Sequence, residues 1–354
     1  MPRIDPPGYC SCPVPVIRWL AMIENLRIAF WGTSRSGLGH LRRLSSIAQS
    51  LVRHAPDLKP TLITNAPPDG LAADDLARFS RIVVCPRRDM AQVLARSRTE
   101  LAVLDTLQLP GMSEFRGQAV LILREMPEAL VEGFRRDDGR PWNRVIVPNP
   151  QAHWMPGDDP QFARDIRAAG WILRPTGPRA PGTPPTGIVV ATGGGGSEET
   201  RAHLYPLLNR LVAMTRARTR HPFLLRHAIG PRAGGAALEQ ADEVFDPGGD
   251  LNAVFRDADL VISTAGYNSV LELANTDTPA LLTAIPRSLD DQAARARLWG
   301  PKLGHWLDPD SLEMAAAWLA DRIDRPRRRP PVDLGPDGAV RTANLILECL
   351  CRAS

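Results

Sequence analysis

Lysine is almost absent from this chain. Lys59 and Lys302 are the only lysines among 43 basic residues, and the formal net charge is +4. The arginine excess therefore reflects genome composition more than a nucleic-acid surface, and we expect no nucleic-acid partner. The five cysteines are scattered and contain no C-x-x-C pair. This argues against a disulfide framework and a cysteine zinc site, and it fits the reducing cytoplasm.

Long apolar runs are also missing. No stretch reaches the roughly 18 uninterrupted apolar residues that a membrane-spanning helix needs, so we expect no transmembrane segment and leave peripheral membrane contact open. A G-x-x-x-x-G-K-[ST] loop is absent, which removes the usual cradle for nucleoside triphosphates. Residues 1–22 are rich in proline and lack a signal-peptide core. We expect them to form a disordered extension, with Met22 as an alternative translation start.

What the chain does contain is an alternation of strand-length apolar runs with helical patterns, which is typical of an α/β fold. The first series of runs reads "LRIAFWG", "PTLIT", "RIVVCP", "LAVLDT", "AVLILRE" and "NRVIVPN". The second reads "IVVATGGGG", "FLLRHAIG", "EVFD", "DLVISTA" and "PALLTAIP". At 354 residues the chain exceeds the usual size of a single core, so we predict two parallel-sheet domains.

Two proline-rich segments mark the connections. Between the two series lies "RPTGPRAPGTPPTG", Arg174 to Gly187, which is too dense in proline and glycine for a helix or a central strand. We interpret it as an interdomain linker. "RPRRRPP", Arg325 to Pro331, separates the last two predicted helices, and its composition favours a solvated connector over a binding patch.

Both halves open with a strand, a glycine-rich turn and a helix start, "IAFWGTSRSGLGHLRR" and "IVVATGGGGSEETRAH". In open parallel sheets, ligands bind beyond the carboxyl ends of the strands, where helix N-termini attract anions. Gly37 and Gly39 would let the backbone approach a ligand. The glycine run that includes Gly194 and Gly195, before a cap at Ser197, destabilises regular structure and suits a turn that admits phosphate or sugar.

His40 would begin the helix after the first glycine-rich turn. A histidine there can take a proton from a hydroxyl near neutral pH, and a neighbouring carboxylate would orient its ring. Asp105, at the end of "LAVLDT", is a candidate for that partner. The residues alone leave open that His40 is an ordinary first-turn polar residue and that Asp105 caps a strand end.

A second candidate turn lies in "DLVISTAGYNSVLELANTDTPALL", Asp259 to Leu282. Gly266 permits a tight turn, and a helix beginning near Asn268 or Ser269 could bind a diphosphate at its first turn. The same residues have another interpretation. Ser269-x-x-Glu272 matches a capping box, in which Glu272 only bonds back to the cap residue.

Over residues 245–300, the order of "AGYNSVLELA", "TPALLTAIP" and "DDQAARA" resembles the C-terminal half of GT-B glycosyltransferases, especially the MurG-like family 28. "GLGHLRR" resembles the N-terminal loop of related bacterial predicted glycosyltransferases and of the nucleotide-sugar hydrolase of pseudaminic acid synthesis. With "LREMPEAL", "RVIVPNP" and "VVATGGGG", the similarity to the predicted group runs over most of the chain.

The resemblance implies two Rossmann-like domains facing each other across a cleft. The expected parts are an N-terminal acceptor domain (23–173), a linker (174–187), a C-terminal nucleotide-sugar domain (188–337) and a last helix (338–354). This last helix could pack back on the first domain. It also implies a donor site that holds the diphosphate, the ribose and the sugar. Gly266, Asn268 and Ser269 would hold the diphosphate, Glu272 would hold the ribose, and Asp291 and Gln292 would hold the sugar. Phe245 would lie near the base, although core packing explains it equally well.

The implied function is that of an inverting glycosyltransferase, which moves a sugar from a nucleotide diphosphate sugar to an acceptor hydroxyl. Family grounds favour a UDP-linked donor and leave the acceptor unknown. We expect no cofactor beyond this co-substrate and no metal, because Asp308-Pro-Asp310, despite its D-x-D form, precedes a helix where a cap is natural. Two alternatives remain, a nucleotide-sugar hydrolase and a non-catalytic nucleotide-sugar-binding protein.

Overall fold

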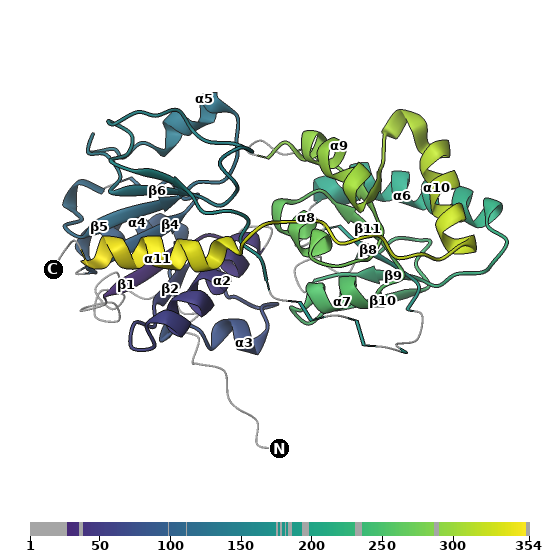
Figure 1. Cartoon of the computed structure of the whole chain (residues 1–354), viewed down its shortest axis with the longest axis horizontal. Coiled ribbons are helices and arrows are strands. Elements are labelled where there is room, and N and C mark those ends of the chain that lie inside the picture. The colour runs from purple at the N-terminus through teal and green to yellow at the C-terminus, as the bar shows by residue number, and fades with distance from the viewer. Residues whose placement is uncertain are drawn as a thin grey trace, which may run out of the picture. The chain divides into compact units, whose positions relative to one another are not determined.

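The computed structural model describes residues 27–34, 38–97, 99–110, 112–174, 176–177, 179–180, 182, 186–192, 198–230, 236–286 and 290–351. The predicted extension, 1–22, lies outside this part of the chain. The chain divides into two compact units, one of residues 1–173 with 335–354 and one of residues 174–334. Each unit contains one sheet (Figure 1). Among the described residues, no helix combines the length and the hydrophobicity needed to span a bilayer.

The first unit is built on a seven-stranded sheet with the order β3-β2-β1-β4-β5-β6-β7, and its neighbouring strands pair in parallel. Six of the strands follow apolar runs of the sequence, and most of their residues are buried. The strands are β1 (Ile28–Gly32), β2 (Thr61–Thr64), β3 (Arg81–Val84), β4 (Leu101–Asp105), β5 (Gln118–Ile122), β6 (Arg144–Val147) and β7 (Ile166–Ala168).

Helices cover both faces of this sheet because side chains alternate between the two faces along each strand. Ile28 and Phe30 of β1 pack with α2 and α11, whereas Ala29 and Trp31 pack with α4 on the opposite face. The helices and short 3-10 turns of the unit are α2 (Gly39–His54), α3 (Ala73–Leu76), α4 (Arg87–Arg96), η1 (Met112–Glu114), α5 (Glu128–Val131), η2 (Glu132–Phe134) and α11 (Gly338–Cys351).

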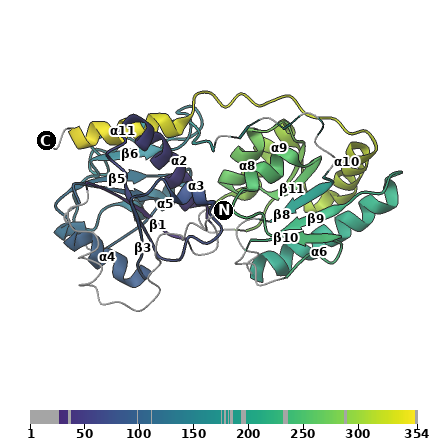
Figure 2. The same ribbon diagram turned by 90° about the horizontal axis from the view of Figure 1, so that it is seen from below.

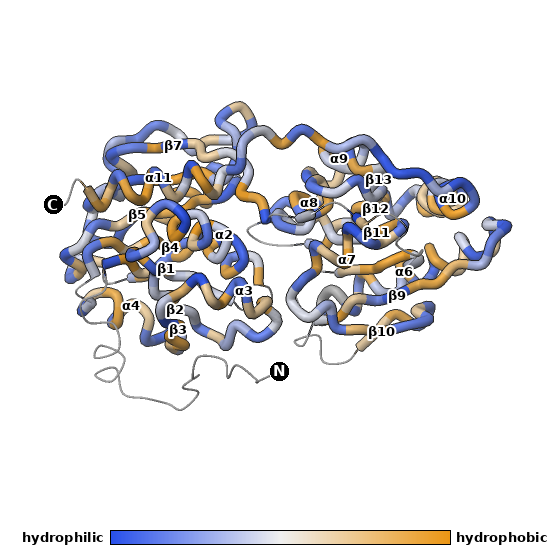
Figure 3. Tube along the Cα trace, turned by 60° about the horizontal axis from the view of Figure 1, so that its bottom comes forward, coloured by the Kyte–Doolittle hydropathy of each residue, from blue (hydrophilic) through white to orange (hydrophobic). Residues whose placement is uncertain are grey.

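Helix α11 joins the first unit although it ends the chain (Figures 1 and 2). Its apolar side chains recur every three or four residues, and the alternation of hydrophobic and hydrophilic segments along it is visible in Figure 3. Polar side chains of the sheet complete the attachment. Arg144 donates to the carbonyl of Leu345 at 2.7 Å, and Gln118 donates to the carbonyl of Cys349 at 2.9 Å.

The second unit is built on a six-stranded parallel sheet with the order β10-β9-β8-β11-β12-β13. Helices α6 and α10 pack together on one face, over apolar side chains of β8, β9, β11 and β12. The strands are β8 (Ile188–Ala191), β9 (Leu225–Ala228), β10 (Glu243–Phe245), β11 (Leu260–Thr264), β12 (Ala280–Thr283) and β13 (Gly304–Trp306). The helices are α6 (Glu198–Arg218), α7 (Leu251–Asp257), α8 (Tyr267–Ala274), α9 (Gln292–Leu303), η3 (Pro309–Ser311) and α10 (Leu312–Asp324).

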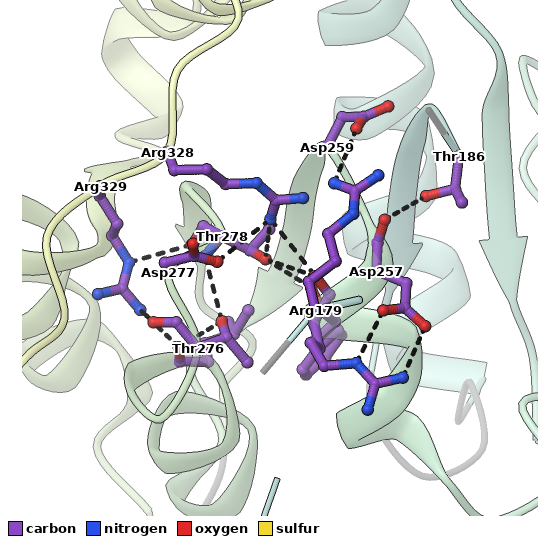
Figure 4. A network of polar contacts seen from close by, with 12 residues as sticks. Arg179, Thr186, Asp257, Asp259, Thr276, Asp277, Thr278, Arg328 and Arg329 are labelled. Carbon is purple, nitrogen blue, oxygen red and sulfur yellow. Dashed lines mark hydrogen bonds and ion pairs between the residues drawn. The ribbon is translucent and has the colours of Figure 1, made fainter. Parts of the chain in front are cut away.

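Both proline-rich segments are fastened to the second unit, near the amino ends of β11 and β12 (Figure 4). From the first segment, Thr186 donates to the carbonyl of Asp257 at 2.8 Å and Arg179 pairs with Asp259 at 3.3 Å. From the second, Arg328 donates to the hydroxyl of Thr278 at 2.7 Å and Arg329 donates to its carbonyl at 3.0 Å. The interpretation of "RPRRRPP" as a solvated connector is therefore wrong for these two arginines.

A buried histidine lies under α6 in the second unit. His227 of β9 is fully buried, its Nδ1 accepts a hydrogen bond from the backbone N–H of Leu238 at 3.1 Å, and its ring packs edge-on against Tyr205. Because burial disfavours the charged ring, the pKa of His227 falls from 6.5 to about 4. Between these two pKa values, the imidazole is neutral in the folded chain and protonated in the unfolded chain.

We predict that stability falls as the pH is lowered from about 6.5 to 4. In this range the unfolded state binds a proton at His227 that the folded state does not, and the difference reaches about 3 kcal/mol. The loss of stability begins as the pH falls below the pKa of His227 in the unfolded chain, 6.5, and ends near its pKa in the folded chain, about 4. Urea unfolding of the wild type and of His227→Gln at several pH values measures this contribution. Parallel pH dependences in the two proteins would contradict the assignment.

Candidate active site

The predicted site residues that the structure describes lie at the carboxyl ends of the strands in both units. In the first unit, His40 follows β1, and Asp105 is the last residue of β4, the neighbour of β1 in the sheet. In the second unit, Gly266 and Glu272 follow β11, and Gln292 follows β12 beside it. This is the edge at which open parallel sheets bind their ligands.

His40, Asp105 and an arginine that the sequence analysis did not identify form one cluster in the first unit. Arg43 lies one turn after His40 on α2 and donates two hydrogen bonds to the Asp105 carboxylate, at 3.0 Å and 2.7 Å. The Nδ1 atom of His40 lies 3.3 Å from an oxygen of Asp105 and 3.3 Å from Nη2 of Arg43. Arg43 and Asp105 are buried, whereas 27% of the His40 side chain is exposed. The imidazole is thus the accessible member of the cluster.

The charge of Asp105 is fixed by its partners. Complete burial alone would raise the pKa of this carboxyl, but Arg43 and His40 outweigh burial and lower the pKa from 3.8 to about 2. Asp105 therefore stays ionised throughout the neutral range. An ionised carboxylate beside Nδ1 can hold a proton on that nitrogen, which leaves Nε2 to accept one.

The backbone directly after Asp105 is strained. Thr106 has a φ of 46°, in the left-handed region that a β-branched residue rarely adopts. Its hydroxyl donates to the carbonyl of Ile122 at 3.1 Å and lies 3.2 Å from Asp105 Oδ1. Strain of this kind persists only where the surroundings impose it, and it gathers at functional sites. It supports a functional role for this strand end.

We predict that Arg43→Met destabilises the protein by about 3–5 kcal/mol, because it leaves a buried carboxylate without its cation. Arg53, exposed near the end of the same helix, provides the matched control, and Arg53→Met should change stability by less than about 0.5 kcal/mol. Chemical denaturation of the two variants tests this. Equal stability of the two variants would show that Asp105 does not depend on Arg43.

Helix α8 gives the second unit its candidate anion site. It begins at Tyr267 with Gly266 as the N-cap residue, and a glycine has no side chain with which to cap the helix. Ser269 therefore lies inside the first turn and is not the cap residue. The capping-box interpretation of Ser269 and Glu272 is wrong for this reason, and another explanation is needed for Glu272, which is buried on α8.

Gly266 is not required by the fold itself. Its φ of −63° and ψ of 146° are open to any residue, and the one described atom that an added Cβ would meet is Ser269 Oγ, at 3.7 Å. The backbone N–H groups in the first turn of a helix have no acceptor within the helix and carry the positive end of its dipole. A glycine here leaves room for a ligand to approach those groups.

A buried arginine ties this turn to the loop after β12. Arg295 of α9 donates to the carbonyl of Ala265 at 3.0 Å and pairs with Asp290 at 2.7 Å. The stretch "DDQAARA" contains this arginine, but nothing in the sequence alone gives it a role. Gln292 is buried in the same place, where it accepts from the N–H of Ile285 at 3.3 Å and donates to Asp290 at 3.2 Å. Asp291 caps α9 by accepting from the N–H of Ala294 at 2.9 Å.

The other predicted residues are placed as follows. Asn268 lies in the first turn of α8, and Gly39 is the first residue of α2. Phe245 ends β10, and the guanidinium of Arg226 lies 4.4 Å from the centre of its ring. Gly37, Gly194, Gly195 and Ser197 lie outside the described residues. Among the residues that are described, no group of three or more His, Cys, Asp or Glu could hold a metal ion, and Asp308 caps the turn η3.

No protein-family model matches the chain. Curated relatives are transferases that carry N-acetylglucosamine from UDP-N-acetylglucosamine to N-acetylmuramyl-(pentapeptide) pyrophosphoryl-undecaprenol. The one from Thiobacillus denitrificans is 35% identical over 52% of this chain and 54% of its own, and the one from Alkalilimnicola ehrlichii is 33% identical over 40% and 44%. The matches thus span about half the length of these relatives.

Solved structures extend the likeness to nearly the whole chain. The kitacinnamycin glycosyltransferase matches 91% of this chain and 98% of its own with a TM-score of 0.55 and 13% identity. MurG of Acinetobacter baumannii matches 91% and 99% with a TM-score of 0.50 and 13% identity. The chain has the GT-B fold. It resembles the MurG-like glycosyltransferases of family 28, and in GT-B terms α8 and the loop after β12 belong to the C-terminal half of the fold.

We predict that Gly266→Ala weakens binding of a UDP-sugar at least about tenfold, because the new methyl group occupies the approach to the first turn of α8. Stability should change by less than about 1 kcal/mol, since the backbone is compatible with alanine. Gly187→Ala is the comparison. There, φ is 77° and a Cβ would lie 2.4 Å from the carbonyl of Leu224, so stability should fall. If calorimetry finds that Gly266→Ala binds a UDP-sugar as tightly as the wild type does, the first turn of α8 is not the anion site.

Proposed function

We propose that the chain is an inverting glycosyltransferase that moves a sugar from a UDP-sugar to an acceptor hydroxyl. The observation that carries the proposal is the open approach to the amino end of α8 at Gly266, a glycine that the fold does not require. The similarity to UDP-N-acetylglucosamine transferases supports a uridine diphosphate sugar as the donor.

In this proposal, the first turn of α8 binds the diphosphate through Gly266, Asn268 and Ser269, and Glu272 binds the ribose. Asp291 and Gln292 belong to the loop that would hold the donor sugar, and Phe245 would lie near the base. Gly37, Gly39 and the glycine run with Gly194, Gly195 and Ser197 would admit the ligand close to the backbone. Arg295, which holds the carbonyl of Ala265, is a positioning residue for this turn.

His40 is the proposed base. Asp105 holds a proton on Nδ1, and Nε2 takes the proton of the acceptor hydroxyl as its oxygen attacks the anomeric carbon. The bond from that carbon to the diphosphate oxygen breaks on the opposite side, so the configuration inverts. The negative charge that develops on the departing diphosphate is stabilised by the N–H groups and dipole of α8.

No cofactor and no resident metal is needed in this mechanism, because the helix end neutralises the leaving group. Activity should therefore persist in EDTA. We also propose that the protein works in the cytoplasm, where nucleotide sugars are made available, and that it binds no nucleic acid. The acceptor class is left to experiment, and contact with a membrane surface is part of that question.

The decisive experiment incubates the protein with UDP-N-acetylglucosamine, with and without N-acetylmuramyl-pentapeptide pyrophosphoryl lipid. A thermal-shift comparison with thymidine, guanosine and cytidine diphosphate sugars identifies the base, since a ligand that binds only the native state raises stability. Transfer to the lipid supports the proposal. Release of free sugar without acceptor identifies a hydrolase, as "GLGHLRR" would allow, and donor binding without turnover on any acceptor identifies a non-catalytic binding protein. Failure to bind any of the four overturns the proposal.

We predict that His40→Ala lowers turnover by about 10²–10⁴-fold and leaves UDP-sugar affinity nearly unchanged. The helix should remain intact because it packs through Leu41, Leu44 and Ile47, which are fully buried. His54→Ala, at the exposed end of the same helix, is the matched control and should keep normal turnover. Near-normal turnover in His40→Ala would place the base elsewhere.

A further inference from the structure

A second histidine and carboxylate pair lies at the carboxyl edge of the first sheet. His153 follows β6, Glu125 follows β5, and His153 Nε2 lies 2.9 Å from Glu125 Oε2. Strand β5 lies between β4 and β6 in the sheet, so this pair belongs to the strand ends next to Asp105. The proposed mechanism gives neither residue a role.

The loop that carries His153 is held in a defined shape. Asn149 is fully buried, and its Nδ2 donates to the carbonyls of Pro150 at 3.0 Å and Trp154 at 2.7 Å. The N–H of His153 donates to the carbonyl of Pro150 at 2.9 Å. The buried ring of Trp171 packs edge-on against the imidazole, with 4.8 Å between the ring centres. The imidazole is thus oriented by the loop, by an aromatic ring and by Glu125.

One nitrogen of this imidazole is available for a ligand. With Glu125 accepting from Nε2–H, the lone pair of a neutral imidazole is on Nδ1. Nδ1 makes no hydrogen bond with any residue that the structure describes, and 20% of the His153 side chain is exposed. A partly exposed contact between a histidine and a carboxylate adds little to stability, so stability alone does not account for so fixed a pair. The arrangement suits a hydrogen bond from a donor such as a hydroxyl.

We propose that His153, oriented by Glu125, binds a hydroxyl group of the molecule that the first unit takes as its acceptor, which belongs to the class of sugars and polyols. Nδ1 accepts the hydrogen bond and Glu125 is a positioning residue. The inference rests on the proposed function only in naming this molecule an acceptor. The orientation of the imidazole and its capacity to bind a hydroxyl are properties of the first unit.

The tautomer tests the role of Glu125 without any assay of activity. In protein labelled with 15N-histidine at mildly alkaline pH, where histidines are neutral, His153 should carry its proton on Nε2. Glu125→Gln should mix the two tautomers, because an amide both donates and accepts. Glu132→Gln, an exposed glutamate paired with Arg135, is the matched control and should leave the His153 signals unchanged. A proton on Nδ1 of His153 in the wild type would overturn the proposal.

Ligand binding is followed with N-acetylmuramyl pentapeptide and with glycerol as soluble hydroxyl probes. The Nδ1 resonance of His153 should move on titration, while that of the exposed His221 should not, and His153→Phe should weaken binding of the responding probe about 3–10-fold. A silent Nδ1 resonance with both probes, or equal affinity in His153→Phe, overturns the inference. Donor binding in the same samples separates the two claims. If a UDP-sugar binds while the His153 resonance does not move with either probe, this inference alone is refuted. If the His153 resonance moves but no UDP-sugar binds, the proposed donor site is refuted.

Discussion

Helix α8 is fixed at both of its ends, and the candidate anion site of the second unit depends on this constraint. At its carboxyl end, Arg329 donates to the carbonyls of Leu273 at 2.5 Å and Thr276 at 2.6 Å, where a cation also suits the helix dipole. Asn275, directly after the helix, donates to the carbonyl of Arg174 at 3.1 Å. At its amino end, Arg295 holds the carbonyl of Ala265. The first turn is therefore held in place from both ends of the helix.

The first unit uses a buried charge in a comparable way. The side chains of Arg43 and Asp105 are almost inaccessible to solvent, so removing either one would leave the other as an isolated buried charge, which is energetically costly. The pair therefore links α2 to the end of β4 and sets the position of His40 beside it. The strained backbone at Thr106 belongs to the same strand end. A neighbouring pair, His153 and Glu125, extends the row of polar groups along the edge, and its imidazole is positioned by packing and by the loop as much as by charge.

The sequence was sufficient for the architecture because buried parallel strands form continuous apolar runs. It failed for β7 and β13, which are three residues long, partly exposed and without such a run. It also misplaced the start of α8. The spacing of Ser269 and Glu272 fits a capping box, but Gly266 is the N-cap residue and the helix begins at Tyr267, before Ser269. A spacing motif cannot reveal which residue leaves the extended conformation.

The arginines of the site could not be recognised for a different reason. With 43 basic residues and only two lysines, arginine is too frequent for any one position to stand out. Arg43, Arg295 and Arg329 acquire their roles only when folding brings them against a carboxylate or carbonyls. Burial and partner geometry are tertiary properties, so the sequence identified the strand ends of the site but not the cations that hold them.

We propose that the amino end of α8 binds the diphosphate of a nucleotide sugar, and a crystal structure of the protein with UDP tests this. We expect phosphate oxygens about 2.7–3.2 Å from backbone nitrogens of the first turn, between Tyr267 and Ser269, the range of ordinary N–H···O hydrogen bonds. UDP bound elsewhere in the chain, with this turn occupied only by solvent, would contradict it.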